Sequence, residues 1–112
     1  MQIPCKVQMD ELIIQDIKQL PPDVRKECFE MLTKLQSNIH MSKPLKNKNG
    51  NNLSDCYKIL FYNAKYRIVY RKCGIDSYEL LGVKPSAEII AIGRRDGQEV
   101  YNIAAERLGR KN

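Results

Sequence analysis

Two aromatic-rich segments in the middle of the chain constrain its fold more than any other feature. The first runs from Tyr57 to Tyr62 and the second from Tyr66 to Lys72, with a three-residue connection between them. Branched and aromatic residues favour strands, and so short a connection favours an antiparallel hairpin. The sequence therefore predicts a β-hairpin. The rest of the chain should indicate what each face of this hairpin contacts.

Alternation assigns the hairpin side chains to two faces of different character. One face is apolar and aromatic, with Tyr57, Ile59, Phe61, Tyr66, Ile68 and Tyr70. The other face is mixed, with Lys58, Leu60, Tyr62, Arg67, Val69 and Arg71. Basic residues on strands are usually solvated, so the simplest interpretation of the mixed face is a sheet surface in contact with water. The alternative is a cationic surface on a rigid platform, suited to a phosphate chain.

Helical patterns lie on either side of the hairpin. Asp10 is expected to cap a helix that ends at Pro21, and Pro22 is expected to begin a second helix with one apolar stripe. The short break between them predicts a helical hairpin. A last helix is expected over residues 98–108, with these residues facing inward: Val100, Ile103, Ala104 and Leu108.

The remaining segments complete an α+β fold. Residues 3–8 predict a short strand, and the apolar run from Ile89 to Ile92 predicts a central one. Residues 38–54 predict a polar loop, whereas residues 74–87 fit either a long loop or a short extra turn. The expected fold is an antiparallel sheet with an N-terminal helical hairpin packed on one face, in the order β-α-α-β-β-β-α. We expect one domain over residues 1–112.

Charge and composition exclude several classes of function. Lys and Arg outnumber Asp and Glu by 19 to 13, a net charge of +6, which attracts polyanions or an acidic protein partner. The apolar runs are too short to span a bilayer and the N-terminus lacks a signal-peptide pattern, so we expect a cytoplasmic protein. The cysteines and the single histidine, His40, lack zinc-ligand spacing, and P-loop, Rossmann, GxSxG and HExxH motifs do not occur. We expect neither a metal nor a cofactor.

The residues that remain as candidates for binding or catalysis are a small set of basic side chains. Lys58 and Arg67 lie on the hairpin, and Arg94 and Arg95 follow the third strand. If that strand lies beside the hairpin, Arg95 reaches the mixed face, and Tyr101 follows six residues later. Such a set suits RNA cleavage by 2′-hydroxyl attack, because arginine binds phosphate oxygens through two parallel hydrogen bonds and tyrosine stacks on bases. Polyanion binding without chemistry is the alternative.

Three motifs in matching order and spacing resemble the RelE branch of the RelE/ParE toxin superfamily of bacterial toxin–antitoxin systems. They are "DCYKI" at 55–59, "YRIVY" at 66–70 and "IGRRDGQEVY" at 92–101. The resemblance covers most of the chain and implies the RelE-like microbial RNase fold. It implies a toxin that enters the A site of the 70S ribosome and cleaves mRNA without metal.

The resemblance also implies partners. A cognate antitoxin with an acidic helical segment is expected to wrap the toxin and block its site. Operator DNA is expected to be bound only through the antitoxin complex, and no membrane is involved.

The resemblance further assigns roles to individual residues. It implies that Lys58 binds phosphate, that Arg67 is the arginine of the second motif, and that Arg95 is a general acid or transition-state stabiliser. It implies that Tyr101 stacks on a base. Supporting contacts to RNA phosphates are expected from Lys46, Lys48, Arg71 and Arg94.

Two departures from the family pattern leave alternatives open. Leu60 stands where RelE has a second lysine that helps to activate the 2′-hydroxyl, and Gly97 stands where a further arginine is expected. The base function then falls to Lys58 alone, or to Lys46 or Lys48 from the loop. A ParE-like inhibitor of DNA gyrase on the same fold is one alternative function, although ParE-type members usually lack this basic set with its tyrosine. A degenerate toxin that only binds its antitoxin and DNA is another.

Overall fold

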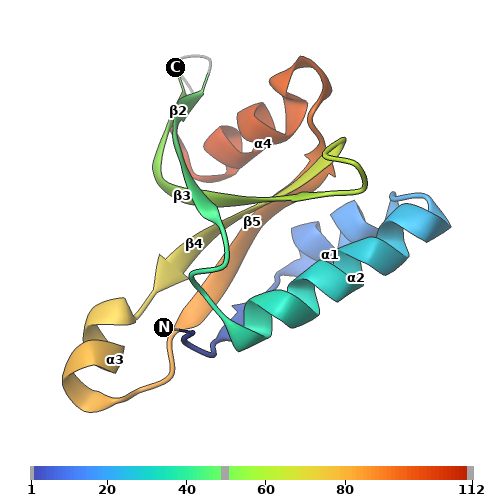
Figure 1. Ribbon diagram of the computed structural model, residues 1–112. Coiled ribbons are helices and arrows are strands. Elements are labelled where there is room, and N and C mark those ends of the chain that lie inside the picture. The colour runs from blue at the N-terminus through green and yellow to red at the C-terminus, as the bar shows by residue number, and fades with distance from the viewer. Residues whose placement is uncertain (1, 49–50, 111–112) are drawn as a thin grey trace.

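Five strands form one open sheet in the order β1-β5-β4-β3-β2 in the computed structural model (Figure 1). The structure describes residues 2–48 and 51–110, without the side chains of residues 46–48 and 51. The strands are β1 (Lys6–Gln8), β2 (Lys43–Lys48), β3 (Asn51–Phe61), β4 (Tyr66–Cys73) and β5 (Ser86–Arg94). The helices are α1 (Glu11–Lys18), α2 (Pro22–Ser37), α3 (Ile75–Leu81) and α4 (Glu99–Arg107), preceded by a 3-10 turn at Asp96–Gln98. The predicted α+β class is confirmed.

The aromatic hairpin forms as predicted, and its register separates the two faces. Tyr62 is an exception: alternation predicts it on the mixed face, but it packs on the side of α1 and α2, because the turn at residues 62–64 interrupts the alternation. β3 and β4 pair antiparallel, with Ile59 opposite Ile68 and Leu60 opposite Arg67. β5 pairs antiparallel with the other side of β4, where Gly93 lies opposite Arg67. The third strand therefore lies beside the hairpin, which is the condition for Arg95 to approach the mixed face.

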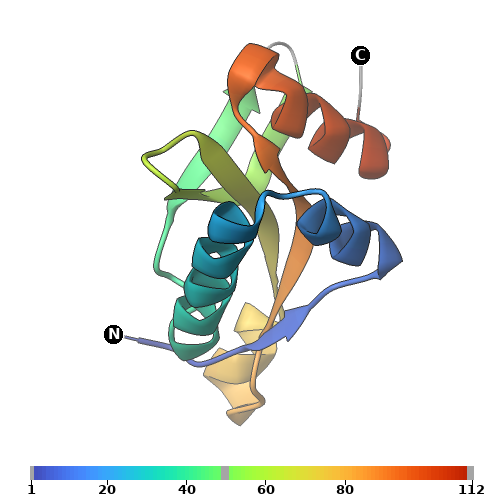
Figure 2. The ribbon, with the colours of Figure 1, turned by 90° about the vertical axis from the view of Figure 1, so that its right-hand side faces the viewer.

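Helices α1 and α2 cover the aromatic face (Figure 2). The Asp10 carboxylate accepts a hydrogen bond from the Ile13 N–H at 3.2 Å, and α2 begins at Pro22, as both patterns predicted. The core between helices and sheet includes Ile13, Ile17, Val24, Leu32, Leu35, Ile59, Phe61, Ile68 and Tyr70. The expected helical hairpin on one face of the sheet is confirmed.

Helix α4 lies on the opposite face and builds a second core there. This core joins Val100, Tyr101, Ala104 and Ala105 of α4 to Leu45, Leu53, Cys56, Val69, Ile90 and Ala91 of the strands. The expected inward positions Ile103 and Leu108 are only partly buried. The buried stripe differs from the prediction because α4 packs against Leu45 and Leu53 as well as against the central strands.

Two segments differ from the sequence prediction at the edges of the sheet. Residues 43–48 form the edge strand β2 instead of a loop, because an edge tolerates Pro44 while Leu45 enters the second core. β1 pairs with β5 in parallel, with Lys6 opposite Ser86, since most of the chain rather than a tight turn connects these two strands. The sheet is therefore antiparallel except at this edge.

Helix α3 resolves the ambiguous segment after β4. It lies between Gly74 and Gly82, whose φ values of 82° and 71° favour glycine. In both ribbon views it lies at the end of the molecule opposite α4 (Figures 1 and 2). None of the helices in the described part of the chain is long and apolar enough to cross a membrane.

Candidate active site

Arg67 is the buried centre of the candidate site. It lies on β4 on the side of α4 and is only 6% exposed. Its Nε donates to the Tyr101 hydroxyl at 3.1 Å, and its Nη1 donates to the carbonyl oxygens of Tyr66, at 3.2 Å, and of Ala64. A buried guanidinium needs such acceptors, because it keeps its charge and has only donors. Arg67 is therefore fixed in place by the turn on one side and by α4 on the other.

The turn between β3 and β4 has an unusual backbone. Three consecutive residues, 62–64, have positive φ values between 52° and 62°, and none of them is glycine. Each such residue costs roughly 1 kcal/mol or more, so the turn must be held by other contacts. Glu27 of α2 accepts a hydrogen bond from the Tyr62 N–H, and the Lys65 carbonyl accepts one from the Arg95 N–H at 3.0 Å. The turn thus connects the hairpin to α2 and to the end of β5.

Arg95 directly follows β5 and lies beside this turn. Its side chain is exposed, while its backbone is anchored to Lys65. Among the ion pairs found in residues 2–48 and 51–110, none includes Arg67 or Arg95. An exposed guanidinium on an anchored backbone can bind an anion that arrives from solvent.

Lys58 shares this face of the sheet with Arg67. Leu60 lies directly opposite Arg67, and Lys58 lies opposite Val69. Lys58 and Arg67 are therefore diagonal neighbours on one face, a relation in which the residues typically lie ~7–8 Å apart. Lys58 is half-buried and Leu60 is 46% exposed. The predicted common face of Lys58, Leu60 and Arg67 is confirmed.

Tyr101 requires a correction. The ring packs in the second core and is only 2% exposed, so neither ring face is accessible to a base. Its hydroxyl instead accepts the hydrogen bond from Arg67 Nε. In this structure Tyr101 orients Arg67 rather than offering a stacking surface, because α4 turns the ring towards the sheet.

Two of the four expected supporting contacts, Arg71 and Arg94, are engaged by carboxylates of the protein. Arg71 Nε donates to Glu88 Oε1 at 3.0 Å, and Arg94 forms an ion pair with Asp96. Glu88 lies opposite Arg71 in the β4–β5 register and neutralises it, so Arg71 has no support as a phosphate ligand. The side chains of Lys46 and Lys48 lie outside the described residues.

Lys43 is a basic residue near the site that the sequence did not single out. It lies directly opposite Lys58 in the β2–β3 register. A hollow of about 350 Å³ beside the two lysines is lined by Met31, Met41, Ser42, Lys43, Lys58, Ile59 and Leu60. The one signal for this strand was Leu45, an apolar residue that stands among polar ones and enters the second core. Within the described residues, no cluster of His, Cys, Asp and Glu side chains is suited to a metal ion.

The fold and the bases at the β3–β4 turn define the class of protein: a RelE-like α+β fold. A free-state structure of an Escherichia coli RelE toxin variant, with two arginines replaced by alanine, matches with a TM-score of 0.60 and 25% identity. The match covers 96% of this chain and 99% of that one. The toxin–antitoxin complex RelBE2 from Mycobacterium tuberculosis matches with a TM-score of 0.62 over 83% of this chain and 100% of that one. Its identity of 19% supports the fold alone.

Similarity in sequence points to a family more specifically than similarity in fold does. An Escherichia coli protein described as a RelE-like toxin is 28% identical over 103 residues, 92% of this chain and 96% of the relative. The mRNA interferase toxin RelE of Escherichia coli is 27% identical over 99 residues, 88% of this chain and 92% of the relative. No family model matches the chain. The two sequence relatives and the RelE structure at 25% identity support the likeness to the RelE branch of the RelE/ParE toxin superfamily that the three motifs predicted.

Proposed function

We propose that this chain is the toxin of a type II toxin–antitoxin system and an endoribonuclease that cleaves mRNA in the ribosomal A site. The observation that carries the proposal is the arrangement of Lys58, Arg67 and Arg95 around one corner of the sheet. The names of the relatives, which include an mRNA interferase toxin RelE, support the same activity. The place of action is then the cytoplasm, where translation occurs.

The proposed reaction is an internal transfer within the RNA. The ribose 2′-oxygen forms a bond to the adjacent phosphorus, and the bond from phosphorus to the 5′-oxygen breaks. A base accepts the 2′-hydroxyl proton, and the departing 5′-oxygen takes a proton from solvent. The intermediate carries more negative charge than the starting diester, so fixed positive donors lower the barrier.

Each basic residue has a distinct part in this reaction. Arg95, exposed on an anchored backbone, donates to the phosphate oxygens as their charge develops. Lys58 binds the same phosphate from β3. Arg67 remains buried, where it adds positive potential and holds the turn that positions Arg95. Tyr101 acts through Arg67 as a positioning residue.

The proposed protein partner is a cognate antitoxin with an acidic helical segment. Structural neighbours include a RelE toxin variant in complex with an antitoxin peptide and an intact RelBE toxin–antitoxin complex, both from Escherichia coli. The net charge of +6 favours association with an acidic segment. Contact with operator DNA is then indirect, through the antitoxin.

Replacing Arg95 tests the nuclease function. Induction of the wild-type protein in bacteria should arrest growth and produce mRNA ends positioned by codon. Arg95→Ala should lower the cleavage rate by ~10²-fold or more, because loss of one transition-state donor costs about 3 kcal/mol. Thermal unfolding should be unchanged, since Arg95 is exposed. Lys18→Ala, an exposed basic residue on α1 over the other face, is the matched control.

The same experiment separates the alternatives. Growth arrest with DNA breaks and without codon-positioned RNA ends would favour inhibition of DNA gyrase. No arrest by the wild-type protein, with antitoxin binding retained, would favour a degenerate toxin. An unchanged cleavage rate in Arg95→Ala would remove Arg95 from the site.

A further inference from the structure

Lys43 lies on the face of the sheet that carries Lys58 and Arg67. The β2–β3 register places Lys43 directly opposite Lys58, and side chains that are directly opposite in an antiparallel pair share a face. Lys58 lies opposite Val69 of the second core, so Lys43 also projects to the side of α4.

Two lysines in this relation repel each other. The Cβ atoms of directly opposite residues typically lie about 5 Å apart, and like charges there are destabilising. An anion bound between the two ammonium groups removes that repulsion. Lys43 is exposed, so such an anion can reach the pair from solvent. The hollow of about 350 Å³ beside the two lysines lies at the border of the two faces, because Met31, Met41 and Ile59 of the core beneath α1 and α2 line it together with Leu60.

We propose that Lys43 supplies the second lysine of the RNA-cleavage site, from β2, where position 60 of β3 has leucine. The inference rests on the proposed nuclease function. Lys43 and Lys58 bind the non-bridging oxygens of the scissile phosphate from one side, and Arg95 approaches it from the β3–β4 turn. Each ammonium offsets part of the charge that develops as the 2′-oxygen attacks.

The register also weighs against the other lysines of β2. Lys46 lies opposite Leu53 and Lys48 lies opposite Asn51, five and seven residues before Lys58 along β3. Both positions lie farther from Arg67 and from the β3–β4 turn than Lys43 does, because β3 runs from Asn51 towards that turn. Lys43 is the lysine of β2 that lies in the same row as Lys58.

The decisive experiment measures single-turnover cleavage of mRNA on programmed ribosomes by full-length variants. Lys43→Gln should lower the cleavage rate about 10-fold or more, while Lys43→Arg, which keeps the charge, should stay within a few-fold of wild type. Adding Leu60→Lys to Lys43→Gln should restore most of the rate, because a positive charge returns to the same face of the sheet from β3. Lys6→Gln, an exposed lysine on β1 at the opposite edge of the sheet, is the control and should be unchanged.

A merely structural role for Lys43 predicts a different result. In that case Leu60→Lys would not restore cleavage, and Lys43→Gln would unfold at a lower temperature, whereas relief of the repulsion alone would leave the unfolding temperature unchanged or raise it. A wild-type rate in Lys43→Gln, or a loss that Leu60→Lys does not repair, would overturn the inference while leaving the nuclease function in place. If the wild-type protein and Lys6→Gln both fail to cleave, the proposed function fails, and the inference fails with it.

Discussion

The two faces of the sheet are covered to different extents. On the side of α1 and α2 the sheet is closed by one apolar core that includes Ile59, Ile68, Ile89 and Ile92. On the side of α4 the cover is partial. Val69 and Ala91 are buried there, while Lys43, Lys58 and Arg67 lie beside them on the same face of the sheet. Arg67 is the charged residue that is buried within the described part of the chain. The candidate site therefore lies at the border of the second core, where a basic side chain can be both anchored and close to solvent.

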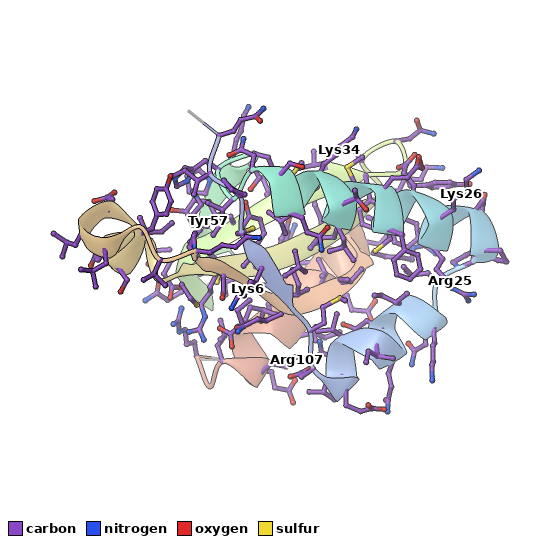
Figure 3. All side chains as sticks on the ribbon, turned by 90° about the horizontal axis from the view of Figure 1, so that it is seen from below. Lys6, Arg25, Lys26, Lys34, Tyr57 and Arg107 are labelled. Carbon is purple, nitrogen blue, oxygen red and sulfur yellow. The ribbon has the colours of Figure 1, made fainter. Side chains whose placement is uncertain are left out.

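An ion pair joins the two faces across the edge of β5. Arg107 of α4 donates to the Asp16 carboxylate of α1 at 2.8 and 3.0 Å and to the Ile90 carbonyl at 2.9 Å. Asp16 also accepts a hydrogen bond from the Ile92 N–H at 3.1 Å. β1 pairs only with residues 86–88 of β5, so these side chains satisfy backbone groups beyond the end of β1. Figure 3 shows Arg107 where α4 approaches α1, and the position of α4 therefore depends on α1.

The largest expected effects come from one leucine on each face. Leu35 of α2 and Leu53 of β3 are both 0% exposed. Leu35→Ala should cost about 4 kcal/mol of unfolding free energy and Leu53→Ala about 3 kcal/mol, because the larger core around Leu35 is enclosed by two helices. Only Leu53→Ala should also slow RNA cleavage, since it loosens α4 above Arg67. Urea unfolding measures the loss of stability, and single-turnover assays measure the loss of cleavage. If Leu35→Ala slowed cleavage as much as Leu53→Ala, the site would not depend specifically on the core beneath α4.

Asp16→Ala should break the connection between the faces. It removes the acceptor of Arg107 and of the Ile92 N–H, and both partners lie partly buried. Breaking a fully buried pair costs roughly 3–5 kcal/mol, and the partial exposure here lowers the expectation to about 2 kcal/mol. Urea unfolding of Asp16→Ala, Arg107→Ala and the double variant gives the coupling energy. Strictly additive losses would show that the two helices are not coupled through this pair.

Tyr101→Phe distinguishes positioning from stacking. The ring is retained and the hydroxyl is lost, so Arg67 Nε loses its acceptor. We expect a loss of about 1–2 kcal/mol in stability, the usual result of leaving a buried donor without a partner, and a cleavage rate about 10-fold lower. If Tyr101 acts by stacking on a base, the phenylalanine variant should keep the wild-type rate.

The smallest expected effect concerns pH and lies away from the α4 face. Burial, and then the positive charge of Lys72, lower the pKa of His40 below its ordinary value of 6.5. The folded protein therefore binds this proton less readily than the unfolded chain does. Stability from this group is complete above pH 6.5 and is lost as the pH falls below it. Thermal unfolding should show a slightly lower Tm at pH 5.5 than at pH 7.5, and His40→Gln should reduce the difference.

Features that depend on short-range patterns could be predicted from the sequence. The hairpin faces followed from alternation, the start of α1 followed from Asp10, and the start of α2 followed from Pro22. The set of Lys58, Arg67 and Arg95 followed from the motifs that carry them, and the register confirms the common face of Lys58 and Arg67. The helix starts and the hairpin faces, apart from Tyr62, are confirmed because each depends on neighbours within a few residues.

Features that depend on distant segments could not be predicted in the same way. β2 is a strand because β3 offers it an edge and α4 covers Leu45, and no local pattern contains either partner. Tyr101 is buried because α4 lies on the second face, which its own periodicity does not determine. Lys43 joins Lys58 only through the pairing of two strands.

The amino-acid sequence alone determined the fold class, the two faces of the hairpin and the family to which the motifs point, because periodicity and turn chemistry act locally. The tertiary structure decided which face α4 covers, that Tyr101 holds Arg67, and that a second lysine lies opposite Lys58 on β2. Those outcomes depend on which apolar surfaces are buried together, and burial is a property of the whole chain.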